Sequence, residues 1–427
     1  MSEVGIALIT AFVVFLIGGV PIVFTLGMAA VIGLWIADID IIVLAQRIIS
    51  GSQVFSLLAV PGFILAGELM TKGGLSRRLV QVCHTFVQHL TGGLGMVTVL
   101  SATFFAAISG SAPATTSAIG SIMIPEMESR GYRRDFSTGL AVAAGPIGQM
   151  IPPSIPMIIW GVISEQSIAK LFLAGVIPGL LIAVGLMILC AVMARSMGVS
   201  AKLRRATGRE ILTALAEGKW ALGAPVIVLG GIYGGIFTPT EAASVGVVYG
   251  FVVGFFIYKE ISLKDLPAIL LDSMKVTSIV VFVIATASVF GWLVAIEQVP
   301  TRVAAALLGI SDNPIVILLI LNLLLLFLGA VMDNIAAMII LGGVLMAVGQ
   351  QIGLDPTHLG AIVVINFAIG MATPPFGYSL FVGAAISKLT IEQISRALWP
   401  MLIVEIVVLM MVTYMPWTTL LLPRLFF

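Results

Sequence analysis

Charged residues are what this sequence has least of. Only 10% of its 427 residues are Asp, Glu, Lys or Arg, while 60% are hydrophobic. Because soluble domains carry about 25% charged residues, this composition excludes an ordinary soluble protein and predicts an integral membrane protein. The formal net charge of +1 gives no reason to expect a nucleic acid as a partner.

Metal-binding and redox residues are also scarce, with two cysteines and three histidines. Cys83 and Cys190 lack any Cys-x-x-Cys spacing, and His84, His89 and His358 form no metal-binding pattern. We therefore expect packing cysteines and loop or interface histidines, and no metal centre. An intramembrane enzyme is disfavoured, because no His, Cys or acid pair converges at one depth. The first four residues lack a basic region and a cleavage site, so no removable signal peptide is expected.

Two small, broken segments interrupt the long apolar runs that make up most of the chain. The first is Gly-Ser-Ala-Pro-Ala-Thr-Thr-Ser at 110–117, and the second is Gly-Pro-Ile-Gly-Gln-Met-Ile-Pro-Pro-Ser at 145–154. In lipid, each unpaired backbone N–H or C=O costs several kcal/mol. A helix can therefore break at membrane depth only where protein or a water-filled cavity covers the break, and transporters place ion and substrate sites at such breaks.

The same pair of segments recurs 222 residues later, without a gap. The shift carries Gly120 onto Gly342, Gly148 onto Gly370, Pro152-Pro153 onto Pro374-Pro375, Ser111 onto Asp333 and Ala112 onto Asn334. This register predicts an internal repeat. We assign repeat 1 to residues 1–195, a polar and basic cytoplasmic connector to 196–219, and repeat 2 to 220–427.

Each repeat is expected to hold five transmembrane helices and one re-entrant helical hairpin. The hairpins are expected at 95–128 and 314–348, and each is followed by a broken helix, at 136–163 and 359–386. The other helices are expected at 4–36 (split at 18–21), 54–70, 171–194, 221–237, 241–258, 276–297 and 398–421, with interfacial stretches at 72–89 and 302–308. The predicted fold class is an all-α polytopic membrane protein. Because five is odd, the two repeats must be inverted relative to each other.

Lysine and arginine positions give the expected orientation. With the N-terminus outside, 17 of the 21 basic residues lie in cytoplasmic segments, whereas only Arg47, Lys170, Arg302 and Arg424 lie outside. Basic residues concentrate on the cytoplasmic side of membrane proteins. The sequence therefore predicts that both termini lie on the outer side of the membrane and that the two hairpins enter from opposite faces and meet near mid-membrane.

Hairpin tips and helix breaks point backbone carbonyls at one place, and Ser and Thr hydroxyls add neutral oxygens. Such a cage suits Na⁺. Site 1 is predicted at Ser109, Gly110, Ser111, Thr115, Gly145, Ile147 and Gly148. Site 2 is predicted at Gly329, Asp333, Asn334, Gly370, Ala372 and Thr373. The alternative is that these side chains only cap or back-bond the half-helices.

The half-helix that restarts after each Pro-Pro pair offers free N–H groups and a positive dipole end, which suit a substrate carboxylate. The predicted substrate residues are Thr116, Pro152, Ser154, Asn334 and Pro374. Asp333 is the only acidic residue in the apolar run 314–348, where an acid is usually functional; the alternative is a water-exposed helix cap. Glu405 lies inside the last apolar helix with no break around it, so we interpret it as an interhelical or subunit contact.

Three segments resemble the large membrane subunit of tripartite ATP-independent periplasmic (TRAP) transporters, of the ion transporter superfamily. They are 109–127, 145–154 and Met-Ala-Thr-Pro-Pro-Phe-Gly at 371–377, and the resemblance extends over essentially the whole chain. It implies a Na⁺-driven importer of organic acids in the bacterial inner membrane, with Na⁺ as the coupling ion. It also implies an elevator mechanism, in which hairpins and broken helices move against a static scaffold.

The resemblance further implies two protein partners, a periplasmic substrate-binding (P-type) protein and a small four-helix membrane (Q-type) subunit. We expect the small subunit to be a separate polypeptide. Sialic acid is the favoured substrate, followed by C4-dicarboxylates. The alternatives are a self-sufficient dicarboxylate carrier or cation antiporter of the same superfamily, and a scaffold or channel without ion coupling, which would leave the paired breaks unexplained.

Overall fold

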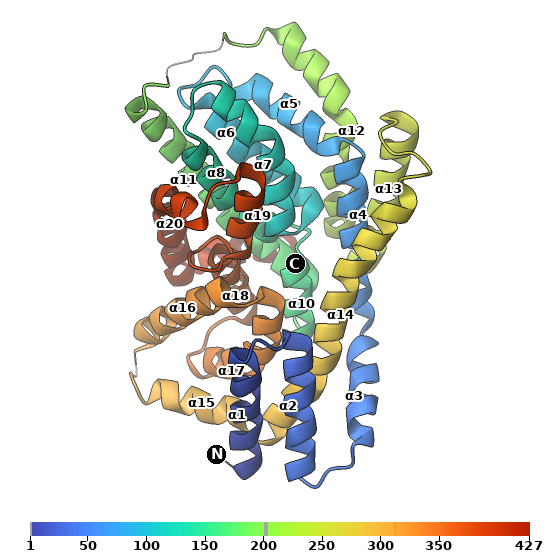
Figure 1. Cartoon of the computed structure of the whole chain (residues 1–427), viewed down its shortest axis with the longest axis vertical. Coiled ribbons are helices and arrows are strands. Elements are labelled where there is room, and N and C mark those ends of the chain that lie inside the picture. Colours follow the sequence, from blue (N-terminus) through green and yellow to red (C-terminus); the bar gives the residue numbers. More distant parts are fainter. Residues whose placement is uncertain (1, 200–203, 312) are drawn as a thin grey trace.

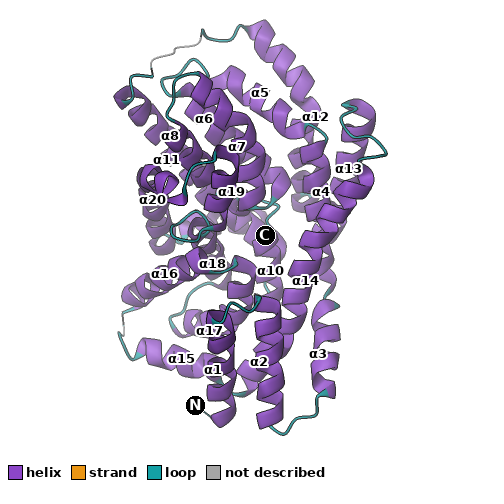
Figure 2. Cartoon of the chain, in the orientation of Figure 1, coloured by secondary structure: helices purple, strands orange, loops and turns teal. Residues whose placement is uncertain are grey.

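The chain is described here by a computed structural model that covers residues 2–199, 204–311 and 313–427. Within these ranges every regular element is a helix (Figures 1 and 2). Up to Ser196 the elements are α1 (Glu3–Ile17), α2 (Ile22–Ile36), α3 (Ile42–Ser52), η1 (Phe55–Leu58), α4 (Ala59–Lys72), α5 (Leu75–Val87), α6 (Gly93–Ser109), α7 (Ala112–Ser129), α8 (Arg134–Ala144), α9 (Ile147–Met150), α10 (Ile155–Ser164) and α11 (Ile168–Ser196).

The rest of the chain continues in the same way. Its elements are α12 (Gly208–Tyr233), α13 (Pro239–Val252), η2 (Val253–Ile257), α14 (Leu266–Ile296), α15 (Val299–Leu308), α16 (Pro314–Val331), α17 (Asn334–Gln351), α18 (Pro356–Gly370), α19 (Tyr378–Ser387), α20 (Ile391–Tyr414) and α21 (Trp417–Phe426). Among the described residues, eight helices are long and apolar enough to cross a bilayer, and one further pair, Arg134–Met150 with Ile155–Ser164, is bent by 41°. The all-α polytopic fold class is confirmed.

The helix bounds of the two halves follow the 222-residue shift. It carries α7, Ala112–Ser129, onto α17, Asn334–Gln351, and it carries the start of α8 at Arg134 onto the start of α18 at Pro356. It also carries the cis peptide bond of Pro152-Pro153 onto that of Pro374-Pro375. The two halves therefore place hairpins and helix breaks at matching positions along the chain.

Four predicted element bounds were wrong, including the start of the helix predicted at 276–297, which is α14 and begins at Leu266. Helix α3 was missed, because Gln46, Arg47 and Ser50 interrupt the apolar pattern that marks a membrane helix. It is held from the side: the Arg47 guanidinium stacks 4.6 Å from the Trp292 ring centre, and Ser288 Oγ donates to the Arg47 carbonyl at 2.8 Å. The other two errors lie at the connector and near the C-terminus.

The connector predicted at 196–219 is helical from Gly208. A capping box starts α12, in which Glu210 N donates to Thr207 Oγ1 at 3.3 Å and Thr207 N donates to Glu210 Oε2 at 2.7 Å. Residues 200–203, including the connector's Lys202, lie outside the described residues. The single helix predicted at 398–421 is two helices, since α20 ends at Tyr414 and Pro416, which lacks an N–H, precedes α21.

The side chain of His358 is not in a loop. It lies in the first turn of α18, fully buried, and its ring contacts Thr419 Oγ1 at 2.7 Å and the Thr413 carbonyl at 3.3 Å. Cys83, in the amphipathic helix α5, is buried, which fits the packing role expected for it. This burial raises the pKa of its thiol to about 12. That thiol stays protonated near neutral pH.

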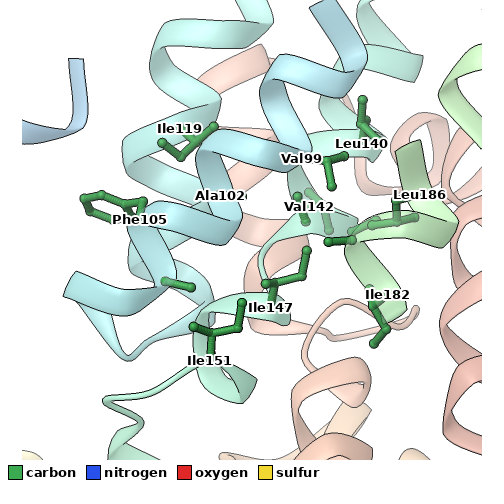
Figure 3. Close-up of a cluster of buried hydrophobic side chains, with 14 of the residues drawn as sticks. Val99, Ala102, Phe105, Ile119, Leu140, Val142, Ile147, Ile151, Ile182 and Leu186 are labelled. Carbon is green, nitrogen blue, oxygen red and sulfur yellow. The ribbon is translucent and has the colours of Figure 1, made fainter. Parts of the chain in front are cut away.

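Buried hydrophobic side chains form three main clusters. The largest joins α6, α7, α8, α9 and α11 to α18, α19 and α20; Figure 3 shows part of it, with Ile147 and Ile151 among side chains of α6 and α11. The second links η1, α4, α12 and α13 with α10, α14 and the second hairpin. The third packs α1 and α2 against α14, α15 and α17.

In Figure 1, α3, α4, α12, α13 and α14 run along one long side of the molecule and α11, α16 and α20 along the other.

Helices α4 and α13 provide a test of close packing on that long side. A methyl group added at Gly62 would lie 2.8 Å from Ala243 Cβ, whereas one added at Gly230 in α12 would meet nothing within 4 Å. We expect Gly62→Ala to force the two helices apart and to lower the free energy of unfolding by about 1–3 kcal/mol. Gly230→Ala should be neutral or stabilising by up to about 1 kcal/mol. Unfolding of the detergent-solubilised protein measures both, and equal effects would contradict the close α4–α13 contact.

Candidate ion and substrate site

The tip of the first hairpin rests on the break of the first broken helix. Helix α6 ends at Ser109, and Gly110 makes the turn into α7 with φ +61°, a conformation that favours glycine. A side chain at Gly110 would lie 2.6 Å from the Pro153 carbonyl oxygen. Ile155 N at the start of α10 donates to the Gly110 carbonyl at 3.3 Å. The hairpin therefore covers the break, as protein must where a helix is interrupted inside the membrane.

Glycines in the break let the hairpin's oxygens approach closely. A methyl group on Gly148 would lie 2.7 Å from the Ser111 carbonyl oxygen and would clash with the Thr115 hydroxyl. One on Gly145 would lie 3.1 Å from the Ala112 carbonyl oxygen and would clash with the Thr116 hydroxyl. The structure thus brings the hairpin and break residues predicted for site 1 together, with Ile147 lying between the two glycines.

The hydroxyl groups of this site differ in what they bind. Ser109 Oγ and Thr115 Oγ1 share a hydrogen bond of 2.7 Å. Ser111 precedes α7 but makes no capping hydrogen bond to it, and Thr116 Oγ1 is buried without a partner among the described residues. Ser154, in contrast, caps α10, because Met157 N donates to its Oγ at 3.3 Å. Ser154 therefore acts as a helix cap, whereas Ser111 does not.

The second predicted site is assembled only in part. Gly329 in α16 lies against Gly370 in α18, since a methyl group on Gly370 would lie 2.7 Å from the Gly329 Cα. Thr373 Oγ1 donates to the Ile369 carbonyl at 2.8 Å, a bond within its own turn. Ala372 N likewise donates to the Ile369 carbonyl, at 2.9 Å.

Asp333 is an exposed helix cap in this structure. Its Oδ1 accepts from Ile335 N at 3.0 Å and from Ala336 N at 3.2 Å, at the start of α17. Among the described residues, no hydrogen bond ties it to 370–373 and no donor reaches its Oδ2. The helix cap that the sequence analysis gave as the alternative role of Asp333 is thus present. The second carboxylate oxygen, Oδ2, has no hydrogen-bond donor among the described residues.

Gln149 joins the two halves and was missed by the sequence reasoning. Its Oε1 accepts from Asn334 Nδ2 at 2.9 Å, at the second hairpin's tip, and its Nε2 donates to Met371 Sδ at 3.3 Å, in the second break. Ser154 Oγ donates to the Gln149 carbonyl at 2.5 Å. Because a thioether sulfur only accepts hydrogen bonds, the contact with Met371 fixes which end of the amide faces which neighbour. The 222-residue shift that pairs Gln149 with Met371 was the available signal.

Three half-helices begin around these residues, at Ala112, Ile155 and Asn334. Their N-termini present N–H groups and positive dipole ends, which favour an anion. The C-terminal ends of α6 and α8, with the tip carbonyls and hydroxyls, favour a cation. Pro152 and Pro374 stand in the two breaks, each in a cis bond to the next proline. No group of three His, Cys, Asp or Glu residues in the described ranges is placed to hold a metal ion.

Comparison with known proteins places these features in a family. The family model described as "Tripartite ATP-independent periplasmic transporter, DctM component" matches residues 9–418. The isethionate TRAP transporter permease DctMQ of Oleidesulfovibrio alaskensis is 42% identical over 95% of this chain, which spans 64% of that longer protein. The C4-dicarboxylate large permease DctM of Pseudomonas aeruginosa is 41% identical, over 89% of both chains.

Two further comparisons cover most of the chain. The sialic acid large permease SiaM of Vibrio cholerae is 39% identical over 96% of both chains. The crystal structure of the Alcanivorax borkumensis YdaH transporter superposes with a TM-score of 0.63 over 89% of this chain and 88% of that one. At 16% identity, that structure is evidence for the fold alone.

The bond between Gln149 and Asn334 is expected to contribute measurably to stability. Polar pairs between membrane helices couple by about 0.6 kcal/mol, with larger values up to about 1.7 kcal/mol. A double-mutant cycle with Gln149→Ala and Asn334→Ala, measured by unfolding in detergent, should give a coupling free energy in this range. Gln149→Ala combined with Ser50→Ala in α3 is the control and should give none. A coupling indistinguishable from the control would contradict the contact.

Proposed function

Because the chain belongs to the DctM family of tripartite ATP-independent periplasmic transporters, we propose that it imports an organic acid by Na⁺-coupled secondary transport. The protein is a transport permease and not an enzyme. The observation that carries the proposal is the first hairpin's tip lying on the Gly145–Gly148 break, which gathers oxygens without any fixed charge.

Sodium fits this cage because carbonyl and hydroxyl oxygens can replace the water ligands of a monovalent cation without adding a fixed charge to the site. Site 1 would use the Ser111 carbonyl and hydroxyl and the Ser109–Thr115 hydroxyl pair. Thr116, predicted as a substrate residue, has a buried hydroxyl beside Gly145 without a partner among the described residues. Site 2 would draw on Gly329, Asn334, the carbonyls of 370–373 and Asp333 Oδ2. Since Asp333 now bonds only to α17, site 2 would have to close around the ion.

The substrate would be an acid whose negative group faces the starts of α10 and α17. The relatives are named for isethionate, C4-dicarboxylates and sialic acid, which all carry an anionic oxygen group. Gln149 is suited to such a group, because its amide nitrogen has only a weak sulfur acceptor in the described structure. Sialic acid remains the favoured substrate, with C4-dicarboxylates next.

Transport would follow an elevator mechanism. We define the moving body as the two hairpins, the two broken helices, α11 and α20, most of which share the largest buried cluster. The scaffold would be the remaining helices, including α4, α13 and α14. Helix α17 contacts both α18 of the body and α14 and α15 of the scaffold, so movement of the body would require this hairpin arm to slide or open.

Two protein partners complete the proposal. A small four-helix membrane subunit would dock on the scaffold, and a periplasmic protein would deliver the acid. The protein would lie in the bacterial inner membrane with both termini periplasmic. The alternative is a self-sufficient carrier of the same superfamily. Reconstitution in liposomes with labelled sialic acid, succinate and isethionate, with and without the two partners, distinguishes them, since a self-sufficient carrier would transport free substrate alone.

Na⁺ coupling is tested at the two positions related by the repeat. Asn can accept the same capping bonds as Asp, so Asp333→Asn removes the charge and keeps the cap of α17. We expect it to weaken the Na⁺ dependence of uptake and flatten its pH dependence, because in the closed form of site 2 a carboxylate without its cation should take up a proton instead. Ser111→Ala should raise the Na⁺ concentration for half-maximal uptake and leave the pH profile unchanged.

Uptake into proteoliposomes that carry the small subunit, with the loaded binding protein outside, measures both variants. Asp333→Ala is the companion variant, which loses the cap as well and should cost about 1 kcal/mol of stability. If Asp333→Asn keeps wild-type Na⁺ and pH profiles, Asp333 acts only as a cap and the coupling role is wrong.

The inverted topology is tested by cysteine labelling in right-side-out vesicles. Arg205→Cys, in the connector, should react only with reagents that reach the cytoplasm. Gln351→Cys, at the end of α17, should react from outside, because the inversion places the second hairpin's ends on the periplasmic face. Both variants sit at exposed positions, so little effect on folding is expected. Labelling of both from the same face would refute the inversion.

A further inference from the structure

Glu405 is a fully buried carboxyl group with no polar contact. It lies near the middle of α20 with 0% of its surface exposed, and neither carboxylate oxygen has a hydrogen-bond partner in the described part of the chain. The sequence interpretation of an interhelical contact is therefore incomplete: the residue lies between helices but binds nothing there. A subunit contact is excluded by its complete burial within this chain.

Its surroundings are apolar. On the same helix face, one turn before and one turn after it, Met401 and Leu409 belong to the largest hydrophobic cluster. Helix α20 packs against α8, α11, α18 and α19. Two turns earlier, α20 touches the first broken helix, since a methyl group on Gly139 would lie 3.5 Å from the Leu398 Cα. Glu405 is thus inside the moving body defined above.

No compensating charge lies at its depth. The ionisable residues on α20 and the four helices packed against it are Glu392, Arg396 and Tyr414 on α20, Arg134 and Asp135 on α8, Lys170, Cys190 and Arg195 on α11, His358 on α18 and Tyr378 on α19. All the charged ones lie in the first two turns or the last turn of their helices. Arg396, on the same helix, is nine residues away, about 13 Å along the axis, and pairs with Glu392. The His358 ring contacts Thr413 and Thr419.

An ionised carboxylate in such a place is strongly unfavourable. Its desolvation costs several kcal/mol even after the protein relaxes, and here no donor offsets the cost. Binding one proton converts the group to a neutral acid and removes most of that penalty. Buried polar atoms without partners among the described residues also occur on two helices packed against α20, at Asn366 Oδ1 and Ser379 Oγ, and neither carries a charge that would offset that of a carboxylate.

We propose that Glu405 is a proton-binding site of the moving body, which holds one proton while the residue is buried as it is here and releases it to water when the helices packed around α20 separate. The bound proton follows from the burial and the missing hydrogen-bond partners. The release step rests on the proposed function and requires a separation of helices within the body, because movement of the body as one unit would leave Glu405 buried. On release the Glu405 O–H bond breaks and the proton passes to water, and reburial takes a proton up again, so uptake at high pH is limited by reprotonation.

The bound proton is tested without any substrate. Infrared spectra of the purified protein in lipid nanodiscs at pH 7 should show a protonated carboxyl band that Glu405→Gln removes. Glu392→Gln, on the exposed first turn of the same helix, is the matched control and should remove none. If Glu405→Gln leaves the protonated carboxyl region unchanged, Glu405 is ionised and the proposal is overturned. Glu405→Leu provides the same comparison if the Gln variant folds poorly.

Stability against pH gives a second, independent measurement. An exposed glutamic acid is ionised above about pH 4.3, so unfolding above that pH releases the proton that the folded protein retains. The unfolding equilibrium constant of the wild type should therefore rise about tenfold per pH unit relative to that of Glu405→Gln. The wild type loses stability as pH rises, and the difference stops growing once the folded carboxyl itself ionises. Parallel pH profiles of wild type and Glu405→Gln would overturn the bound proton.

The release step is tested by uptake at saturating Na⁺, where competition at Asp333 is suppressed. Using whichever of sialic acid, succinate or isethionate the complete system transports, wild-type uptake should fall several-fold between pH 7 and pH 9, while Glu405→Gln should retain its rate. If Glu405→Gln loses the infrared band but keeps the wild-type alkaline decline, the proton is bound and not exchanged, and the release step is wrong. If the wild type shows no Na⁺-dependent uptake at all, the proposed function fails instead, and the infrared result is unaffected.

Discussion

The rest of this structure depends on the pairing of backbone polar groups at membrane depth. The first broken helix leaves carbonyls free at the end of α8 and N–H groups free at the start of α10, and in lipid each would cost several kcal/mol. The chain pairs N–H groups at the start of α10 internally: the Gly110 carbonyl accepts from Ile155 N, and Ser154 Oγ accepts from Met157 N. A break and a hairpin tip therefore have to occur together. The same requirement explains why the two features recur as a pair in the second half of the chain.

Close approach is what makes this pairing possible, and glycine provides it. At Gly145 and Gly148 the absence of a side chain lets the hairpin's carbonyls and hydroxyls lie against the helix axis, and at Gly329 and Gly370 it lets two backbones cross. Oxygens packed this closely around a helix end form a concave, partly negative surface. The oxygen-lined surface that we propose as an ion-binding cage is thus a direct consequence of covering a break, before any side chain is chosen for the ion.

Sequence could predict this framework because its signals are local. Gly and Pro mark breaks, and apolar runs mark helices, so the hairpins and broken helices were placed to within a few residues. What sequence could not supply depends on tertiary contacts. Helix α3 is stabilised by its packing on α14 and not by an apolar run. The role of Gln149 exists only because the second hairpin's tip reaches the first break. The cap made by Asp333 is likewise visible only in the backbone geometry of α17.

Electrostatic asymmetry between the two halves follows from these contacts. The first site contains hydroxyls and carbonyls only, whereas its repeat equivalent carries a carboxylate whose one oxygen is already held by α17. A neutral site can release its ion at little electrostatic cost, while a site with a fixed charge must exchange its ion for another cation or a proton. With Glu405 as a second acid in the same proposed body, two carboxyl groups, those of Asp333 and Glu405, each need a cation or a proton to be neutral. At Glu405 the apolar walls around α20 enforce that condition, because they offer no hydrogen-bond donor or counter-charge that would let the carboxylate stay ionised.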